Sequence, residues 1–365
     1  MAKAPKVAIV HDWLVGGGAE RVVQALHEMY PDAPIYTAFA TKEWRDKLDG
    51  KVVTGYLQHL GFMRRAIPFL ITHWFSHLNL SGYDLVISSS GNGGAKAVRV
   101  PEGTTHVCYC HAPTHYYWRH SKQYLENPGF GVLNPLARVV LRVLLKPLRA
   151  ADLKASKRPD YYIANSTHTA SEIKTYYDRE SVVVTPPVDI ARFKTTQPNQ
   201  RHGFVTAGRL VPYKHVDIIV KACNALGLPL TVIGRGPALS SLQALAGPQV
   251  AILTDVSDQE MPELLASAEA FIFAAYEDFG ITPVEAMACG TPVIAYQKGG
   301  ALDYVVEGKS GAFFSQQSVK SLMQTIKDFK PGAYDPKAII KHAEQFSTPQ
   351  FKASFSHALK QLLGE

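Results

Sequence analysis

The sequence predicts an α/β protein that contains two doubly wound parallel sheets, and three observations support this prediction. The chain has 365 residues, a length that fits two domains better than one. Short runs of β-branched and aromatic residues alternate with segments long enough for helices, which is the pattern of βαβ units. The alternation pauses at Pro186-Pro187 and then restarts, so we expect a domain boundary there.

Predicted strands lie on both sides of the proline pair. Those of the first half are residues 7–10, 85–88, 106–110, 161–164 and 182–185. Those of the second half are residues 204–207, 230–233, 250–253, 270–273 and 292–295. The predicted domains are therefore residues 1–186 and 187–346. Apolar residues recur at helical spacing in residues 347–365, so we expect a closing helix that packs back on the first domain.

The composition is that of a globular protein, with 46% hydrophobic and 19% charged residues and no low-complexity tract. The four cysteines form no CxxC pair and have no zinc-like spacing. The first residues carry no apolar signal segment, and no run of 18 apolar residues occurs. We therefore expect a cytoplasmic protein and leave open its peripheral attachment to the inner face of a membrane.

The net charge of +7 is unevenly distributed along the chain. Residues 132–158 hold seven basic residues against a single acid, Asp152, which indicates an anionic partner. We expect no nucleic-acid partner, because the chain has no zinc-finger, RNP or basic-zipper pattern and its basic residues are not interleaved with aromatic ones. A lipid surface or a phosphate group is favoured instead.

Part of this basic segment has the pattern of an amphipathic helix. Its basic residues are Arg138, Arg142, Lys146 and Arg149, and its apolar residues are Val139, Val140, Val143 and Leu144. Two interpretations stand: a helix packed on the first domain with a solvated charged face, or a helix that contacts an anionic membrane surface. A second apolar and basic segment, which contains Arg64 and Arg65, favours the membrane contact.

A glycine run follows the first predicted strand. Gly16, Gly17 and Gly18 lie between that strand and a predicted helix, where backbone amides and the helix N-terminus favour an anion such as phosphate. The spacing is not GxGxxG, so the dinucleotide fingerprint is absent. The alternative is a tight strand-to-helix turn without a ligand.

His111 comes directly after another predicted strand, and Pro113 prevents that strand from continuing. His111 is therefore expected on a loop at the strand end. Aromatic and polar residues able to hold a sugar ring follow it. They are Tyr116, Tyr117, Trp118 and Arg119. Lys96, near the end of an earlier strand, is a candidate for binding an acceptor phosphate. The alternative for the His111 loop is a packed loop with a hydrogen-bonded histidine.

Arg209 and Lys214 follow the first predicted strand of the second half. Two cations at a strand end can neutralise a diphosphate and stabilise the negative charge that it gains as it departs. The alternative is a solvated arginine and a lysine at a helix end, which is ordinary for surface charges.

The most specific motif lies between a buried strand and a helix, at residues 276–286, and holds Glu277 and Glu285 eight positions apart. Three backbone amides are expected to be free at the helix start, where a sugar hydroxyl or a phosphate can accept them. They are those of Phe279, Gly280 and Ile281. Residues 282–285 also match a capping box with proline at the first helical position, so Glu285 has a structural alternative.

Together these motifs resemble the retaining GT-B glycosyltransferases of glycosyltransferase family 4, over both halves and most of the chain. The glutamate pair, the two cations, the glycine run and His111 follow the order of that family's pattern. The segments around the glycine run and His111 are similar to mannosyltransferase-like members. The resemblance implies two Rossmann-like domains that face a cleft, with the acceptor bound by the first and the nucleotide sugar by the second.

The resemblance also implies a role for each matching residue. Arg209 and Lys214 would bind the donor diphosphate, Glu285 the ribose hydroxyls, and Glu277 and His111 the transferred sugar. Gly17 and Gly18 would approach a phosphate or the acceptor, and Val256 would line the base pocket.

The implied reaction is transfer of a hexose, with mannose from GDP-mannose favoured, to a glycan or a lipid-linked acceptor with retention of configuration. The sequence has no Asp-x-Asp motif, so we expect neither a metal nor a cofactor, and the nucleotide-diphosphate sugar serves as co-substrate. Two alternatives are a sugar-nucleotide epimerase of the GT-B fold and a non-catalytic carbohydrate-binding relative. The glutamate pair argues against the first, and the intact set of charged residues argues against the second.

Overall fold

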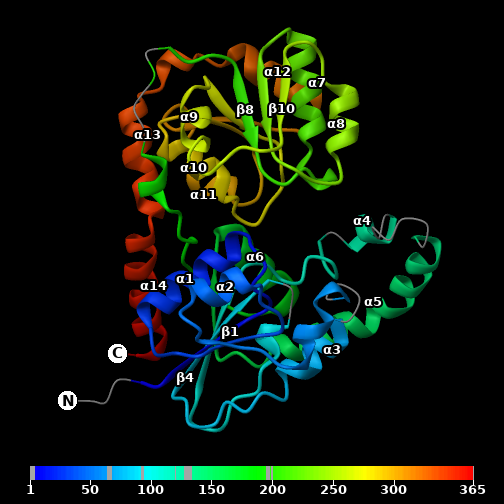
Figure 1. The fold of residues 1–365 in the computed structure, drawn as a ribbon, viewed down its shortest axis with the longest axis vertical. Coiled ribbons are helices and arrows are strands. Elements are labelled where there is room, and N and C mark those ends of the chain that lie inside the picture. The colour runs from blue at the N-terminus through cyan, green and yellow to red at the C-terminus, as the bar shows by residue number, and fades with distance from the viewer. Residues whose placement is uncertain are drawn as a thin grey trace. The chain divides into compact units, whose positions relative to one another are not determined.

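The computed structural model describes residues 5–63, 68–91, 94–119, 121–126, 134–194, 198 and 200–364. The chain divides into two compact units, of which the first is Met1–Pro186 with Lys352–Glu365 and the second is Pro187–Phe351 (Figure 1). Each unit contains one sheet, and all the strand pairs of both sheets are parallel. The predicted α/β class with two Rossmann-like units is confirmed.

The first unit contains a seven-stranded sheet. In order across the sheet, its strands are β3 (Val52–Val53), β2 (Ile35–Thr37), β1 (Val7–His11), β4 (Leu85–Ser90), β5 (Thr105–Cys110), β6 (Tyr161–Ala164) and β7 (Val182–Val183). The chain builds outward from β1 to β2 and β3, then returns to place β4 on the other side of β1. The order of the strands therefore reverses between β1 and β4.

Helices surround this sheet and one of them projects from it. The helices are α1 (Gly18–Met29), α2 (Lys42–Lys47), α3 (Pro68–Phe75), α4 (Ser121–Glu126), α5 (Asn134–Ser156) and α6 (Thr167–Tyr177). In Figure 1 the N-terminal part of α5 extends away from the sheet beside α4. No helix in the described part of the chain is long and apolar enough to cross a bilayer.

The second unit contains a six-stranded sheet. In order across the sheet, its strands are β10 (Val250–Leu253), β9 (Leu230–Ile233), β8 (Phe204–Ala207), β11 (Ala270–Phe273), β12 (Val293–Tyr296) and β13 (Gly311–Phe314). Its helices are α7 (Val216–Leu226), α8 (Leu239–Leu245), α9 (Met261–Ala266), α10 (Ile281–Ala288), α11 (Ala301–Tyr304), α12 (Val319–Asp328) and α13 (Pro336–Ala343). Here the order reverses between β8 and β11.

Both faces of the central strands β8, β11 and β12 are buried, which explains why their residues are mostly apolar. Successive side chains of a strand point to opposite faces. Phe271 and Phe273 of β11 pack in the cluster that contains α10, whereas Ala270 and Ile272 pack in the cluster that contains α7. The strand consequently has no solvent-facing side and holds the loop after it in a fixed position.

The last helix, α14 (Thr348–Leu363), belongs to the first unit from Lys352 onward. Phe355 is fully buried and its ring lies 6.4 Å from that of Tyr109 on β5. Lys352 forms an ion pair of 2.5 Å with Glu28 of α1. The chain therefore returns to the first unit after completing the second.

Candidate active site

Each sheet reverses its strand order at one point, and ligands of doubly wound sheets bind at the carboxyl ends of the strands beside such a point. In the second unit the reversal lies between β8 and β11, and in the first between β1 and β4. The predicted site residues Arg209, Glu277 and His111 come after β8, β11 and β5, so all three lie at carboxyl ends near a reversal.

In the second unit, the loop after β8 presents both predicted cations. Gly208 has φ +136°, a backbone conformation that favours glycine, and it turns the chain directly after the strand. The guanidinium of Arg209 donates a hydrogen bond of 2.8 Å to the hydroxyl of Tyr213. A pocket is lined by this loop, by Lys214 and by the ends of β8 and β11.

Lys214, which lines this pocket, forms an ion pair with Glu277. Their Nζ and Oε1 atoms are 3.1 Å apart, and the side chains are 17% and 21% exposed. Because both side chains are only partly exposed, the attraction between them is screened less than at an open surface. The structure thus places a cation and a carboxylate side by side at the carboxyl ends of the two central strands.

A pair of glycines that the motif analysis did not identify holds the Glu277 loop in place. The amide of Gly300 donates a 3.0 Å hydrogen bond to the carbonyl of Glu277. A Cβ on Gly299 would lie 2.4 Å from that carbonyl, and one on Gly300 would lie 2.3 Å from the Cα of Phe279. Only glycine permits this approach of two backbones. The sequence feature that could have identified this contact is the adjacent pair Gly299-Gly300, directly before α11.

No described side chain caps the start of α10, and Glu285 does not have the predicted capping alternative. The helix begins at Ile281 with Gly280 as its N-cap, and no side chain caps it. Glu285 therefore lies inside the helix, where it is 7% exposed. The capping-box alternative was wrong because the left-handed backbone of Gly280, at φ +89°, starts the helix two residues earlier.

Only the backbone of Phe279 remains a candidate for binding a ligand. Its side chain is buried in the core and packs edge-on against Tyr304, with 5.4 Å between ring centroids. Val256, predicted at the base pocket, is partly buried and packs against the same core cluster. The amides of Phe279, Gly280 and Ile281 remain the ligand-binding candidates at this helix start.

A second glycine loop, after β9, was also missed by sequence reasoning. Gly234 and Gly236 have φ +144° and +157°. A Cβ on Gly234 would lie 1.9 Å from the carbonyl oxygen of Gly208, so this loop supports the Arg209 loop backbone against backbone. Arg235, between these two glycines, is exposed. It donates a hydrogen bond of 2.7 Å to the carbonyl of Thr254 and forms an ion pair with Asp255. The signal was the Gly-Arg-Gly sequence directly after a predicted strand.

In the first unit, His111 lies beside the β1/β4 reversal. Its Nε2 is 2.7 Å from the hydroxyl of Ser89, the next-to-last residue of β4. The rings of His11 and Tyr109 lie edge-on to the His111 ring, with 6.3 and 5.2 Å between ring centroids. Burial, together with the nearby His11, lowers the pKa of His111 to about 3, so the ring is neutral at pH 7.

The glycine run before α1 binds a carboxylate of this same chain. Glu20 is 4% exposed and accepts hydrogen bonds from the amides of Val15 and Gly16, at 3.2 and 2.9 Å. A Cβ on Gly17 would lie 3.0 Å from the other oxygen of Glu20. These two amides are therefore already occupied, and the amides of Gly17 and Gly18 are the remaining candidates for a ligand.

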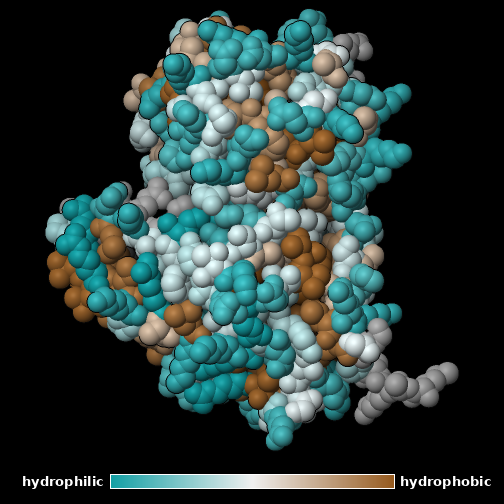
Figure 2. Space-filling view, turned by 180° about the vertical axis from the view of Figure 1, so that it is seen from behind, coloured by the Kyte–Doolittle hydropathy of each residue, from teal (hydrophilic) through white to brown (hydrophobic). Residues whose placement is uncertain are grey.

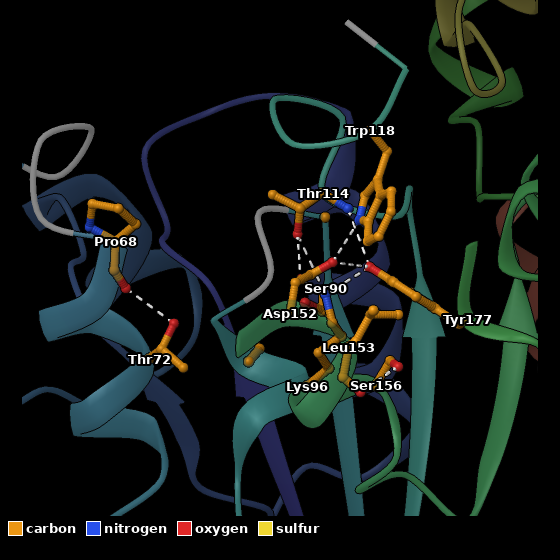
Figure 3. A network of polar contacts seen from close by, with 12 residues as sticks. Pro68, Thr72, Ser90, Lys96, Thr114, Trp118, Asp152, Leu153, Ser156 and Tyr177 are labelled. Atoms are coloured by element: carbon orange, nitrogen blue, oxygen red, sulfur yellow. Dashed lines mark hydrogen bonds and ion pairs between the residues drawn. The ribbon is translucent and has the colours of Figure 1, made fainter. Parts of the chain in front are cut away.

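Lys96 does not have the position predicted for an acceptor-phosphate ligand. It is 1% exposed, and its ammonium donates to Asp152 at 2.6 Å, Tyr177 at 2.9 Å and Thr114 at 3.3 Å (Figure 3). Although burial alone disfavours its charge, the Asp152 carboxylate raises the pKa of Lys96 above its ordinary value. The prediction was wrong because this lysine is an internal ion-pair partner.

Trp118 and Arg119 are partly exposed and use their polar groups in contacts within the first unit, and their role at the acceptor surface stays a prediction. The indole Nε1 of Trp118 donates to Asp152 at 2.8 Å, and its ring stacks on Tyr176. Arg119 pairs with Glu172 at 3.2 Å, and both side chains are 9% exposed. Tyr116 and Tyr117, both partly buried, remain candidates.

The basic residues predicted to contact a membrane divide into three groups. Arg64 and Arg65 lie outside the described residues. The prediction was wrong for Arg149, because its guanidinium donates hydrogen bonds to the carbonyl of Tyr117 at 2.7 Å and to the hydroxyl of Ser121 at 3.1 Å. These bonds hold α5 against the loop before α4. The remaining three, Arg138, Arg142 and Lys146, are exposed on the N-terminal half of α5.

Apolar side chains are also exposed on that half of α5. They are Leu136, Val139, Val140 and Val143, at 65%, 59%, 45% and 70% exposure. At 3.6 residues per turn these four form one stripe, bordered on one side by the three cations. Figure 2 shows apolar residues gathered on this projecting arm. The interpretation of a helix packed against the domain is therefore wrong for this half.

Models of two protein families match the chain. The model described as Glycosyltransferase Family 4 matches residues 16–192, and that described as Glycosyl transferases group 1 matches residues 187–346. The first match falls on the unit with His111 and the second on the unit with Arg209 and Glu277.

Curated relatives match over part of their length. A D-inositol 3-phosphate glycosyltransferase of Mycolicibacterium smegmatis is 29% identical over 58% of this chain and 56% of its own. A GDP-mannose-dependent alpha-(1-6)-phosphatidylinositol monomannoside mannosyltransferase of the same species is 29% identical over 39% of this chain and 45% of its own. The chain spans about half the length of the curated relatives it matches.

Solved structures resemble the chain over nearly all of it. The Anabaena HepE protein in complex with UDP-glucose has a TM-score of 0.69 at 20% identity and covers 98% of this chain and 100% of its own. Sucrose-phosphate synthase of Thermosynechococcus elongatus has a TM-score of 0.70 at 14% identity and covers 99% of this chain and 100% of its own. At these identities the likeness shows the fold.

Proposed function

Because the chain belongs to glycosyltransferase family 4 and has the GT-B fold of two Rossmann-like units, we propose that it transfers a hexose from a nucleotide-diphosphate sugar to a glycan or lipid-linked acceptor. The observation that carries this proposal is the approach of Lys214 and Glu277 to 3.1 Å at the β8/β11 reversal, with Arg209 on the same loop. The two cations can bind the diphosphate of the donor, and the carboxylate beside them can bind its sugar.

The two cations act on the leaving group. As the bond between the sugar and the diphosphate breaks, negative charge grows on the phosphate oxygens, and fixed cations stabilise it without having to reorganise. The Tyr213 hydroxyl orients Arg209, and the Gly208 turn sets the loop. Free amides at the start of α10 add hydrogen-bond donors for the phosphates or for sugar hydroxyls.

Glu277 and Glu285 are proposed to bind the sugar and the ribose. The Gly299-Gly300 pair fixes the backbone of Glu277, so its carboxylate has a defined position before a ligand arrives. Transfer proceeds with retention of configuration, in which the acceptor attacks the face from which the nucleotide departs, and this route needs no second carboxylate as nucleophile.

Mannose from GDP-mannose is the proposed donor sugar. The GDP-mannose-dependent mannosyltransferase among the relatives supports this donor. UDP-glucose, which is bound in the HepE structure, is the alternative donor to be tested. Relatives named for inositol 3-phosphate and for a phosphatidylinositol mannoside support a polar or lipid-linked acceptor.

The test begins with a thermal-shift screen of GDP-mannose and UDP-glucose, because a ligand that binds the folded protein raises its melting temperature. Release of the nucleotide diphosphate is then followed with and without inositol phosphate or phosphatidylinositol vesicles. Glu277→Gln is expected to lower turnover at least about 100-fold, the typical cost of removing one group that stabilises a transition state.

The matched control is Asp217→Asn. Asp217 forms an ion pair of 2.9 Å with Lys221 in the same unit, but on the exposed side of α7. This variant is expected to keep full turnover. If Glu277→Gln also kept it, the catalytic assignment would be wrong. Conversion of the donor without nucleotide release would instead indicate an epimerase.

We also propose that the N-terminal half of α5 binds an anionic membrane surface, which would bring the enzyme to a lipid-linked acceptor. The exposed apolar stripe would enter the headgroup region, and Arg138, Arg142 and Lys146 beside it would meet anionic lipids. An interfacial helix needs both features together, since apolar contact and electrostatic attraction add.

Flotation with phosphatidylglycerol vesicles tests this surface. The double variant Arg138→Glu and Arg142→Glu, and separately Val139→Ser with Val143→Ser, should each abolish flotation at physiological salt. Lys320→Glu with Lys327→Glu makes the same charge change on exposed residues of α12 and should leave flotation intact. No flotation of the unmutated protein, or equal flotation of all variants, contradicts the proposal.

A further inference from the structure

Three side chains at the β1/β4 reversal form a continuous hydrogen-bonded chain. Nδ1 of His11 lies 2.9 Å from the carbonyl oxygen of Ser89 and 3.0 Å from its hydroxyl oxygen. That hydroxyl lies 2.7 Å from Nε2 of His111. Ser89 is fully buried and His11 is 3% exposed. The direction of each hydrogen bond therefore follows from the donors and acceptors of these three residues.

The carbonyl of Ser89 fixes the first proton. A carbonyl oxygen only accepts, so Nδ1 of His11 carries a hydrogen and donates it. The same N–H points at the hydroxyl oxygen of Ser89, which thus accepts from it. A serine hydroxyl has a single hydrogen, and among the described residues the other contact of this hydroxyl is Nε2 of His111, which is therefore the available acceptor for that hydrogen. Nε2 of His111 accepts and carries no proton.

We infer that Ser89 is a positioning residue that holds His111 as the neutral tautomer with its proton on Nδ1, so that His111 donates a hydrogen bond from Nδ1 to an oxygen of the sugar ligand. The assignment of that oxygen to a sugar rests on the proposed function. Nδ1 of His111 makes no hydrogen bond to the described part of the chain, and contacts with the rings of His11 and Tyr109 set the plane of the imidazole.

This tautomer limits what His111 does. A neutral imidazole with Nδ1–H is a directed donor, and it has no proton to give up easily, so its task is to orient a hydroxyl or ring oxygen rather than to act as an acid. A site built to donate to one oxygen also discriminates against a sugar that lacks it, because the N–H would then lose its partner. Ser89 would thereby contribute to specificity without touching the sugar.

The neighbouring residue of the same strand supplies a matched control. Ser88 is also fully buried, and its hydroxyl lies 2.8 Å from Nε2 of another histidine, His106. Ser88→Ala and Ser89→Ala remove the same hydroxyl and the same kind of hydrogen bond from adjacent positions. Only the hydroxyl of Ser89 bonds to His111. Ser88→Ala therefore measures the general cost of removing a buried serine hydroxyl.

Long-range ¹H–¹⁵N spectra of the full protein with ¹⁵N-labelled histidine report the tautomer of each ring. The His111 signal is assigned by its loss in His111→Gln. We expect protonated Nδ1 in the unmutated protein, a shift toward protonated Nε2 in Ser89→Ala, and no change at His111 in Ser88→Ala. Ser89→Thr keeps the hydroxyl and should keep the tautomer.

Turnover of GDP-mannose or UDP-glucose is measured on the same variants. Ser89→Ala should lower kcat about tenfold, the size of one hydrogen bond, with KM little changed, and Ser88→Ala and Ser89→Thr should retain it. A proton on Nε2 in the unmutated protein, or an unchanged tautomer in Ser89→Ala, overturns the inference. A tautomer shift without a fall in kcat overturns its sugar-binding part. If no donor is turned over at all, the proposed function has failed, and the spectra still decide the role of Ser89.

Discussion

Asp152 accepts hydrogen bonds from four side chains of the first unit. Lys96 and Thr114 donate to one of its oxygens, at 2.6 and 2.9 Å, and Trp118 and Tyr177 to the other, both at 2.8 Å. Every lone-pair direction of the carboxylate therefore has a donor. This network joins the inner half of α5 to the loop after His111 and to α6, and it fixes residues 114–118 beside the candidate site.

Removing one charge of this network should lower the free energy of unfolding substantially. Asp152→Asn leaves the Lys96 ammonium buried without its counter-charge, and breaking such a pair typically costs about 3 to 5 kcal/mol in the free energy of unfolding. Urea unfolding followed by circular dichroism measures the loss. Lys96→Met combined with Asp152→Leu should recover much of it, because no charge then stays buried.

The control is Asp178→Asn. Asp178 pairs with Lys174 at 2.9 Å but is 89% exposed, so its loss should leave the urea midpoint nearly unchanged. A loss in Asp152→Asn no larger than in this control would show that the internal pair contributes little to the fold.

The role of Lys96 shows what a sequence does not reveal about a charged residue. Its position near the end of a predicted strand is typical of a ligand-binding lysine, whereas its partner Asp152 lies 56 positions later, among basic residues. The pairing exists only once α5 folds back onto the sheet. Glu277 and Lys214 were easier to predict, because the strand ends that carry them meet at one edge in any parallel sheet.

At the scale of elements, the two strands that precede Arg209 and Glu277 were predicted at their observed bounds. The expected strands at residues 204–207 and 270–273 are β8 and β11. The short β2 and β3 and the glycine-started β13 were missed. A Cβ on Gly311 of β13 would lie 1.9 Å from the carbonyl oxygen of Val293, so this strand needs a residue with low strand propensity. Close packing, invisible in the sequence, overrode propensity there.

Gly300 gives a test of how one element holds another. Its φ of −65° is open to any residue, so Gly300→Ala introduces no backbone strain of its own. The new Cβ would lie 2.3 Å from Phe279 Cα and 2.5 Å from the Asp278 carbonyl oxygen, which must push the Glu277 loop away. We expect a fall in kcat of about 10- to 100-fold, in keeping with the sensitivity of catalysis to small displacements.

Gly332→Ala serves as the comparison, because a Cβ at Gly332 would meet nothing within 4 Å. It should retain turnover and the melting temperature. Circular dichroism must show that Gly300→Ala is folded. Equal turnover of the two variants would mean that the glycine pair does not position Glu277.

At the scale of the molecule, donor binding is assigned to one unit. We expect hydrogen exchange with added GDP to slow in the loops after β8, β9 and β10 and at the start of α10, because a bound ligand suppresses local opening. UDP serves as the matched probe. Protection confined to the first unit would contradict the assignment of the donor to the second.

The path of α14 has a consequence for how the chain is made. The first unit is interrupted after Pro186 and resumes at Lys352, so its sheet lacks the packing of Phe355 against Tyr109 until the whole second unit has been synthesised. Domains generally fold during synthesis in the order in which they emerge. Here the unit that starts first is completed after the second, and the second, an uninterrupted stretch, is free to fold before α14 of the first unit has been made.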